Sequence, residues 1–473
     1  MQMMSDAAVR GFYYKPRTTL EMLRAHSEGI IATAACVSGI IPRSILRGQP
    51  DEALKWARTF KEVFAPGDFY IEIQDHGLTF ENGMTDRQLD EQLVELARSL
   101  DLKVIATNDF HYLTRDDAPT QDLMMCIGMN AKVDDENRMR MEGSEFYMKT
   151  EQEMRELFSW CPEACDNTLE IAEKCNVELD WDQIILPRFP LLDPGETHES
   201  QFRRECEKGL RQHYGDDWAT REINGVNIKE RFEYEYKVIC DKGFAAYFLI
   251  VAEYVQWAKD NGIGVGPGRG SAAGAIVAYA MGITDLDPMP NGLMFERFLS
   301  PERVEMPDID VDFDPEGRMR VLGYVADKYG HDKVAQCVIY GTIKTKQALK
   351  DSARIMGFPF ETGTRITEAL PPAATGGKDI SVHDIFDPSA KRYAEAREYR
   401  ELYDSDPEVK RITEEAKGIE GLIRQTGVHA CATIMGSAPI TDTSPLLERT
   451  DGTVTTTFEY HTCETLGLVK MDF

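Results

Sequence analysis

The feature that most constrains this chain is a short run in which aspartates alternate with apolar residues, Met306-Pro-Asp-Ile-Asp-Val-Asp-Phe313. Strict alternation predicts a β-strand, because successive side chains of a strand point to opposite faces of its sheet. Asp308, Asp310 and Asp312 would therefore share one face, while the apolar residues between them would anchor the other face in a core.

Aspartates on one face of a strand repel one another. Neighbours two residues apart lie about 7 Å from each other, and at an effective dielectric constant of ~20 two negative charges at that distance repel by roughly 2–3 kcal/mol. A divalent cation between them removes this cost, and Mg²⁺ takes oxygen ligands that it usually shares with substrate phosphates. The run therefore predicts a magnesium site, with a solvated sheet face as the alternative interpretation.

A glycine-rich loop, Gly264-Val-Gly-Pro-Gly-Arg-Gly-Ser271, precedes the aspartates. Glycines let backbone N–H groups approach an anion closely. The apolar segment Ala272–Met281 that follows predicts a buried helix, whose N-terminus would attract a phosphate. The loop lacks the Gly-Lys-Ser/Thr of a P-loop and the spacing of a dinucleotide-binding loop. Together with the aspartates it predicts nucleotidyl transfer, in which two metal ions stabilise the attacking and leaving oxygens.

Composition and charge exclude several classes of protein. The 473 residues are enough for two to four domains, and no apolar run approaches the ~20 residues of a membrane span. Ten scattered cysteines without a disulfide framework indicate a reduced, cytoplasmic compartment. The net charge of −28 opposes a simple nucleic-acid-binding protein, because such proteins usually carry a basic surface. Any contact with DNA would come from local basic patches or from parts outside this sequence.

The first part of the chain alternates helical and strand-like patterns. This order implies an α/β layer with parallel strands. Predominantly helical patterns follow between residues 119 and 176. The clearest predictions are strands at 69–73, 103–107 and 334–340 and helices at 52–64, 86–100, 199–213, 230–242, 244–257 and 317–329.

Three segments carry a resemblance to a known family: Gly266-Pro-Gly-Arg-Gly-Ser271, Phe295-Glu-Arg-Phe-Leu-Ser-Pro-Glu-Arg303 and the aspartate run itself. They resemble the bacterial C-family DNA polymerases, the replicative DNA polymerase III alpha subunits and their error-prone relatives, and the similarity extends along nearly the whole chain. The resemblance implies a multidomain α/β and α+β fold. Its expected parts are the C-terminal part of a PHP domain at 1–178, a polymerase-β-like nucleotidyltransferase palm at 179–339 and 418–473, and an inserted helical thumb at 340–417.

The resemblance also implies roles for residues of the palm. Asp308 and Asp310 would ligate two Mg²⁺ ions. Asp472, on a second alternating run at 468–473, would complete the metal that lowers the pKa of the primer 3′-hydroxyl. We expect Asp312 either to support the metal ligands without binding the metal or to be structural. The positions that match triphosphate-binding residues of the family are Arg269, Gly270, Ser271, Arg297, Arg303 and Lys470.

Two further groups of residues are less specific. Lys344, Lys346, Lys350 and Arg354 are either contacts to a duplex backbone or a solvated helix face. His429 lies in a segment that resembles the palm, and we assign it no chemistry.

Asp109 and His111 follow the last strand of the α/β layer, where metal ligands are common, although the pair by itself is also typical of a surface contact. The resemblance implies that Cys36, Asp109 and His111 match later ligands of the PHP metal cluster, which would bind Zn²⁺ or Mn²⁺. The His-x-His motif that opens such a domain is absent, so we expect an incomplete site without full PHP nuclease chemistry. We expect His76, which matches no ligand position, to be structural.

The implied function is that of a DNA-directed DNA polymerase of the bacterial replicase. The substrates would be primer–template DNA and deoxynucleoside triphosphates, and other replicase subunits and the sliding clamp would bind through regions absent from this sequence. We expect a fragment that lacks both ends of the parent polymerase, including the fingers, and is not competent alone. The alternatives are an inactive truncated remnant or interaction module, an error-prone translesion paralogue, or another nucleotidyltransferase.

Overall fold

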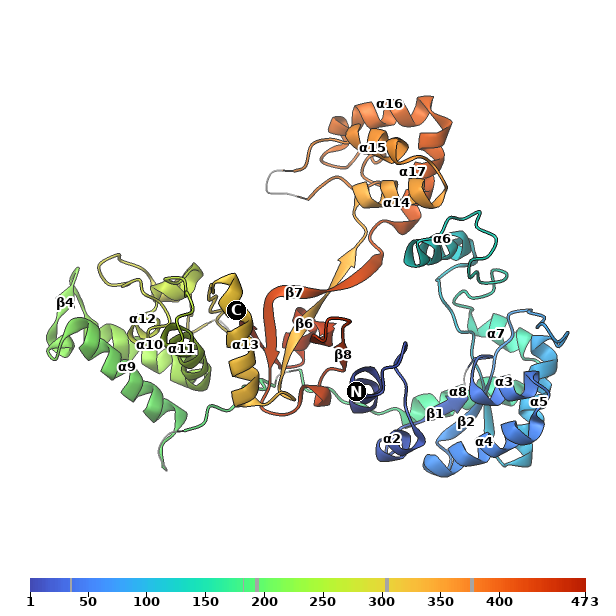
Figure 1. The fold of residues 1–473 in the computed structure, drawn as a ribbon, viewed down its shortest axis with the longest axis horizontal. Coiled ribbons are helices and arrows are strands. Elements are labelled where there is room, and N and C mark those ends of the chain that lie inside the picture. Colours follow the sequence, from blue (N-terminus) through green and yellow to red (C-terminus); the bar gives the residue numbers. More distant parts are fainter. Residues whose placement is uncertain (35, 182, 192–194, 303–305, 375–377) are drawn as a thin grey trace. The chain divides into compact units, whose positions relative to one another are not determined.

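The computed structural model describes the whole chain except residues 35, 182, 192–194, 303–305 and 375–377 (Figure 1). The described chain forms two compact units. Unit 1 consists of Met1–Thr18, Glu178–Ile339 and Gly427–Phe473, and unit 2 of Thr19–Val177 and Tyr340–Thr426. In the described parts of the chain, no helix has the length and apolar character that crossing a bilayer would require.

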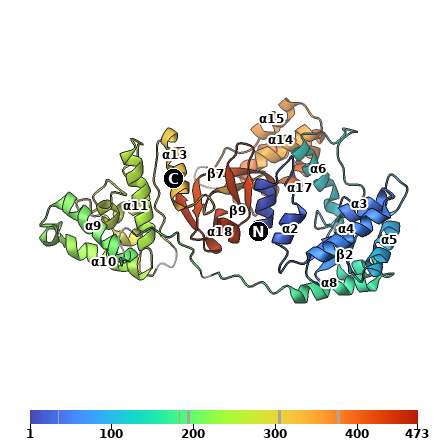
Figure 2. The same cartoon turned by 60° about the horizontal axis from the view of Figure 1, so that its bottom comes forward.

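Unit 2 contains a three-stranded parallel sheet with the order β1-β2-β3 (Figures 1 and 2). The strands are β1 (Ala32–Ala34), β2 (Phe69–Ile73) and β3 (Lys103–Ala106). Every residue of β2 is buried, as expected for a central strand of a parallel sheet covered by helices. The surrounding helices are α3 (Ile40–Leu46), α4 (Pro50–Val63), α5 (Asp86–Ser99) and α8 (Pro162–Lys174). The predicted α/β layer with parallel strands is confirmed.

A capping box begins the longest of the predicted helices in this layer. The Thr85 hydroxyl accepts the Gln88 N–H, and the Gln88 side chain accepts the Thr85 N–H, so two backbone donors at the start of α5 are satisfied. Leu89, Leu93 and Ala97 recur every four residues along the same face and are buried in the core of the layer. The capping box thus sets where α5 begins, and the apolar periodicity sets which face of the helix packs in the core.

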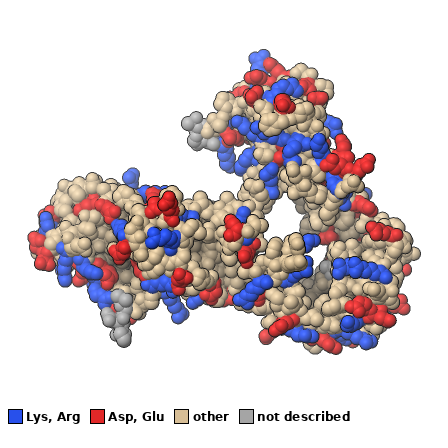
Figure 3. Space-filling model, in the orientation of Figure 1, with Lys and Arg blue, Asp and Glu red and all other residues tan. Residues whose placement is uncertain are grey.

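A helical core forms the rest of unit 2. It is built by α6 (Ala118–Met129), α14 (Thr345–Ile355), α15 (Phe360–Glu368), α16 (Arg397–Ser405) and α17 (Pro407–Ile419). Arg354 of α14 donates to Asn130 (2.7 Å) and pairs with Asp351 (3.4 Å), so it has a structural role. Lys344 and Lys346 are exposed, and Figure 3 shows both basic and acidic side chains on the α14–α17 helices.

The helices of unit 1 pack around one apolar core. They are α9 (His198–Tyr214), α10 (Ile228–Asp241), α11 (Ala245–Asp260), the short α12 (Ile276–Ala280) and α13 (Pro315–Tyr329). Most residues of α11 are buried, including Tyr247, Phe248 and Tyr254. The sequence predicted this central place for α11, because the helix is apolar over most of its surface.

Unit 1 also contains the greater part of a five-stranded sheet with the order β10-β7-β6-β9-β8. Its strands are β6 (Val334–Thr342), β7 (Ile423–Met435), β8 (Leu446–Glu448), β9 (Val454–Glu459) and β10 (Val469–Asp472). β10 runs antiparallel to β7, with Lys470 opposite Ile434 and Asp472 opposite Ala432. The predicted strand around Asp472 is therefore confirmed.

The aspartate run is extended, but it does not form a regular strand. It makes two isolated bridges, an antiparallel one between Phe313 and Val265 and a parallel one between Asp310 and Asp472. Pro307 supplies no N–H to a ladder, which is one reason why pairing is so limited. The predicted alternation still holds: Ile309 and Val311 are buried, whereas the aspartates beside them are more exposed.

The prediction of one buried helix at Ala272–Met281 is wrong. Gly270–Gly274 forms the 3₁₀ turn η4, and α12 begins only after Ala275, which has extended dihedral angles (φ −98°, ψ 123°). The physical reason is a close tertiary contact, because a Cβ on Gly274 would lie 2.6 Å from the Met294 carbonyl oxygen. The chain bends at this glycine to let a second backbone segment approach.

A similar close approach predicts a measurable effect on stability. A Cβ on Gly209 in α9 would lie 1.7 Å from the Ala280 carbonyl oxygen of α12. We expect Gly209→Ala to force the two elements apart and to lower the free energy of unfolding by roughly 1–3 kcal/mol. The measurement is urea denaturation followed by circular dichroism.

The matched control is Gly323→Ala in α13, where nothing lies within 4 Å of the added Cβ. This change should raise the free energy of unfolding by up to about 1 kcal/mol, because alanine favours the helix. Equal effects of the two substitutions would contradict the proposed packing of α9 on α12.

Candidate metal centre

Three carboxylates from two distant parts of the chain meet in unit 1. Asp308 and Asp310 lie on the extended run before α13, and Asp472 lies on β10. One oxygen from each carboxylate lies within 4.8 Å of the others. Among the residues that the structure describes, this is the one group of three or more acidic, histidine or cysteine side chains with such spacing. The sequence predicted all three members.

Backbone hydrogen bonds hold the two segments in place. The Ile309 N–H donates to the Tyr247 hydroxyl of α11 (3.2 Å), between the first two aspartates. At the other segment, the Phe473 N–H donates to the Cys431 carbonyl (3.2 Å), and Arg318 of α13 donates to the Phe473 carbonyl (3.1 Å). The sequence did not identify Tyr247, because a tyrosine in an apolar helix carries no signal of the segment that it will meet.

Two cationic side chains partly neutralise the acidic group. The Lys470 Nζ lies 2.9 Å from Asp472 Oδ2 and 3.4 Å from Asp308 Oδ2. The Arg269 guanidinium lies 3.1 Å from Asp310 and 3.2 Å from Asp312. Arg269 and Lys470, both predicted to bind triphosphate, thus contact the carboxylates directly. Asp312 forms an ion pair with Arg269 and is not one of the three grouped carboxylates.

The electrostatic environment shifts the pKa values of these groups. Burial, together with the charge of Asp308, raises the pKa of Asp310, and Arg269 opposes this shift. Burial disfavours the charged form of Lys470, but its hydrogen bond to Asp472 and the charge of Asp308 outweigh burial, so the pKa of Lys470 is raised. The lysine therefore stays charged. By formal charge, Arg269 and Lys470 offset only part of the negative charge of the four aspartates that they contact.

The donor set fits a hard divalent cation. Asp472 is only 5% exposed, and its Oδ1 is buried without a hydrogen-bond partner. A buried carboxylate oxygen is rarely left unsatisfied, and an ion such as Mg²⁺ takes oxygen ligands of this kind. Asp308, Asp310 and Asp472 are the residues that would hold it.

The glycine loop runs beside the aspartates. The Gly266 N–H donates to the Asp312 carbonyl (2.8 Å), and the Asp314 N–H donates to the Gly264 carbonyl (3.0 Å). Gly270 has a positive φ of 69°, and a Cβ at this position would lie 3.4 Å from Asp310 Oδ2. The loop therefore brings Gly270, and with it the exposed Ser271, to the edge of the acidic group.

The other predicted triphosphate-binding residues are less closely tied to the group. Arg297 is exposed at the end of the 3₁₀ turn η5 (Phe295–Arg297), and none of the ion pairs among the described residues joins it to the carboxylates. Arg303 lies outside the described residues.

The residues predicted for the PHP metal cluster are only partly brought together. His111 Nε2 lies 3.6 Å from Asp109 Oδ1, whereas the exposed Cys36 belongs to no group of three candidate ligands within the described chain. His76 is buried, bonds through Nε2 to the Asn108 carbonyl (2.9 Å) and stacks on Phe146. Its contacts are those of a structural residue.

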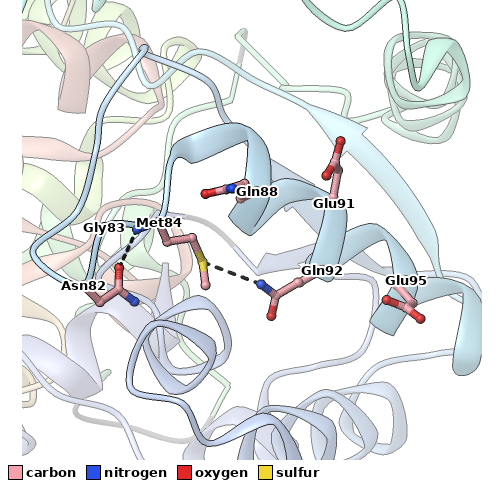
Figure 4. Close-up of a pocket in the computed structure, with 7 residues that line it drawn as sticks. All are labelled: Asn82, Gly83, Met84, Gln88, Glu91, Gln92 and Glu95. Carbon is pink, nitrogen blue, oxygen red and sulfur yellow. Dashed lines mark hydrogen bonds between the residues drawn. The ribbon is translucent and has the colours of Figure 1, made fainter.

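A separate hollow of about 520 Å³ lies in unit 2, at the start of α5 (Figure 4). The Met84 N–H donates to Asn82 on one side, and Gln92 reaches the Met84 sulfur on the other. Glu91 is already paired with Arg87 (2.9 Å). The hollow is polar, and nothing in it resembles the group of three carboxylates.

Comparisons with known proteins show which family the chain resembles. The profile of the family described as "Bacterial DNA polymerase III alpha NTPase domain" matches residues 200–473, and that of the PHP domain matches residues 1–76. The chain is 47% identical to a DNA polymerase III subunit alpha of Mycobacterium tuberculosis, over 97% of this chain and 38% of that protein. It is 40% identical to the protein of the same name from Borreliella burgdorferi, over 100% of this chain and 39% of the relative. The chain thus spans about two-fifths of the length of these relatives.

The geometry predicts which aspartates bind a metal. Asp308→Ala removes one of three converging oxygens, so we expect the affinity for Mn²⁺ to fall by roughly tenfold or more. Asp312→Ala, whose carboxylate pairs with Arg269 outside the group, should leave the affinity within about twofold of wild type. Free Mn²⁺ can be titrated by electron paramagnetic resonance, and equal losses in the two variants would contradict the assignment.

Proposed function

This chain belongs to the bacterial DNA polymerase III alpha family, and from that premise we propose that it carries the nucleotidyl-transfer site of a replicative DNA polymerase. The reaction would add a deoxynucleoside monophosphate to the 3′-hydroxyl of a primer. The observation that carries the proposal is the group of Asp308, Asp310 and Asp472 beside a glycine loop. A nucleotidyl transferase requires both parts: oxygen ligands for metal, and a backbone that an anion can approach.

The carboxylates would hold two Mg²⁺ ions, which lower the pKa of the attacking hydroxyl and stabilise the leaving oxygen. Asp308 and Asp310 would contribute to both ions and Asp472 to one. Buried neighbours fix the segments that carry them, together with two hydrogen bonds: the Ile309 N–H donates to the Tyr247 hydroxyl, and Arg318 donates to the Phe473 carbonyl. Such fixed groups need no reorganisation during the reaction, which is the main source of catalytic power in sites of this kind.

Arg269 and Lys470 would neutralise the triphosphate in different ways. The Arg269 side chain is 52% exposed and can turn toward a ligand, whereas Lys470 is 16% exposed and held by two carboxylates. Gly270 and Ser271 would donate from the loop, and Arg297, at the end of η5, would add positive charge. The family resemblance implies the same role for Arg303, which lies outside the described residues. These roles follow the family resemblance and the exposure of the described residues.

The partners of the whole polymerase are part of the same proposal. Primer–template DNA would contact basic side chains such as Lys344 and Lys346, and other replicase subunits and the sliding clamp would bind parts outside this chain. Asp109, His111 and Cys36 would form the residual PHP site for Zn²⁺ or Mn²⁺. All ten cysteines are free thiols, consistent with the proposed cytoplasmic location.

Two alternatives to this function remain to be distinguished, and only the first changes what the acidic group does. In an inactive remnant or interaction module, the acidic group would bind neither metal nor nucleotide. In an error-prone paralogue, the same site would act on damaged templates. The site itself favours nucleotidyl transfer over a remnant, because Asp472 Oδ1 is buried without a partner and such an arrangement is costly unless a ligand uses it.

The test is binding of a fluorescent deoxynucleoside triphosphate by this chain with and without Mg²⁺. Binding should require Mg²⁺, and Asp308→Ala should abolish it. Arg269→Gln should weaken it by roughly tenfold or more, the effect of losing a charge-assisted hydrogen bond of about 1.5–3 kcal/mol.

Arg211→Gln is the matched control, because Arg211 is an exposed arginine of α9 in the same unit. It should bind nucleotide as the wild type does. Failure of the wild-type chain to bind any triphosphate with Mg²⁺ present would contradict the proposed function and support the inactive remnant.

A further inference from the structure

Arg231 and Glu235, one turn apart on α10, form a buried ion pair. Arg231 Nε lies 2.5 Å from Glu235 Oε1, and Glu235 is fully buried. Removing two charges from water is costly, and replacing such a pair by apolar residues often leaves stability unchanged or higher. The stability of the core alone therefore does not account for the pair, and both residues make further contacts with the backbone.

Arg231 also binds two separate backbone segments. Its Nη2 donates to the Gly274 carbonyl (2.8 Å) and to the Leu293 carbonyl (3.2 Å). Gly274 ends the η4 turn that begins at Gly270, and Leu293 lies just before the η5 turn that ends at Arg297. The Arg231 guanidinium thus links the segment that carries Gly270 and Ser271 to the segment that carries Arg297.

Glu235 fixes the first of these segments from the other side. Its Oε2 accepts the Val277 N–H (3.2 Å) at the start of α12. Because α12 has only five residues, it has few internal hydrogen bonds of its own, and this carboxylate supplies an acceptor for a donor at its first turn. Arg231 and Glu235 therefore bind the chain on both sides of Ala275, where the predicted helix is interrupted.

The two segments also touch each other where the pair holds them. A Cβ on Gly274 would lie 2.6 Å from the Met294 carbonyl oxygen, so only glycine permits this approach. Tyr234 of α10 packs edge-on against Phe295, with ring centroids 6.0 Å apart. A single helix thus contacts both segments through side chains on successive turns.

We propose that Arg231 and Glu235 are positioning residues that set the distance between the loop carrying Gly270 and Ser271 and the segment carrying Arg297. The inference rests on the proposed function, because both segments supply triphosphate-binding groups there. Neither residue touches the carboxylates of the metal centre. Loss of the pair should therefore weaken triphosphate binding while leaving metal binding intact.

The test compares Glu235→Gln with Glu233→Gln on the same helix. Glu233 pairs with Arg203 (2.7 Å) at a half-exposed position and contacts neither segment. For Glu235→Gln we expect the affinity for a fluorescent deoxynucleoside triphosphate with Mg²⁺ to fall about tenfold and the affinity for Mn²⁺ alone to stay within about twofold. Glu233→Gln should change neither affinity.

Hydrogen exchange followed by mass spectrometry supplies a readout that does not depend on nucleotide. In Glu235→Gln, exchange should rise together in peptides covering 270–277 and 293–297 and remain as in wild type for α13. Arg231→Lys is the second variant, because one ammonium group cannot replace a guanidinium that spans two carbonyls and a carboxylate. It should show the same pattern if Glu235→Gln does not fold.

Unchanged triphosphate affinity in a folded variant would overturn the proposal. Exchange that rises uniformly over the chain, with Mn²⁺ binding lost as well, would also overturn it, because the pair would then serve stability alone. If the wild-type chain bound no triphosphate, the proposed function would fail. The exchange of the two segments would still decide whether the pair holds them together.

Discussion

Mutual repulsion of three carboxylates is the constraint on which the rest of unit 1 depends. With their oxygens within 4.8 Å of one another, each ionised pair is repelled by about 3 kcal/mol at an effective dielectric constant of ~20. The fold opposes this repulsion with buried anchors at Ile309 and Val311, a hydrogen bond from the backbone to Tyr247, and cations at Arg269 and Lys470. These contacts hold in place an arrangement that the proposed bound metal would make favourable.

The same constraint explains how the two distant parts of the sequence are used. The aspartate run makes too few backbone hydrogen bonds to fix its own position. Its parallel bridge to Asp472 depends on β10. β10 in turn pairs with β7 in a fixed register, so Lys470 and Asp472 point the same way toward the group. The net charge of −28 is compatible with the proposed phosphate binding, because Arg269 and Lys470 supply positive charge locally at the carboxylates.

Sequence patterns predicted the parts that depend on local rules. Alternation predicted the shared face of Asp308 and Asp310, and helical periodicity predicted α5 and α11. The helix after the glycine loop was predicted wrongly, because the bend at Gly274 is caused by Met294, twenty residues later in the chain. Tyr247, Arg231 and Glu235 were not identified for the same reason: their partners lie 42 to 62 residues away.

The most direct test of the central claim is a crystal structure of this chain with Mn²⁺ and a non-hydrolysable deoxynucleoside triphosphate, with the metals located by anomalous scattering. The account predicts two peaks at Asp308, Asp310 and Asp472, separated by about 3.5–4 Å, with the triphosphate against Gly270 and Ser271. A bound triphosphate without metal at these carboxylates, or metal at other residues alone, would contradict it.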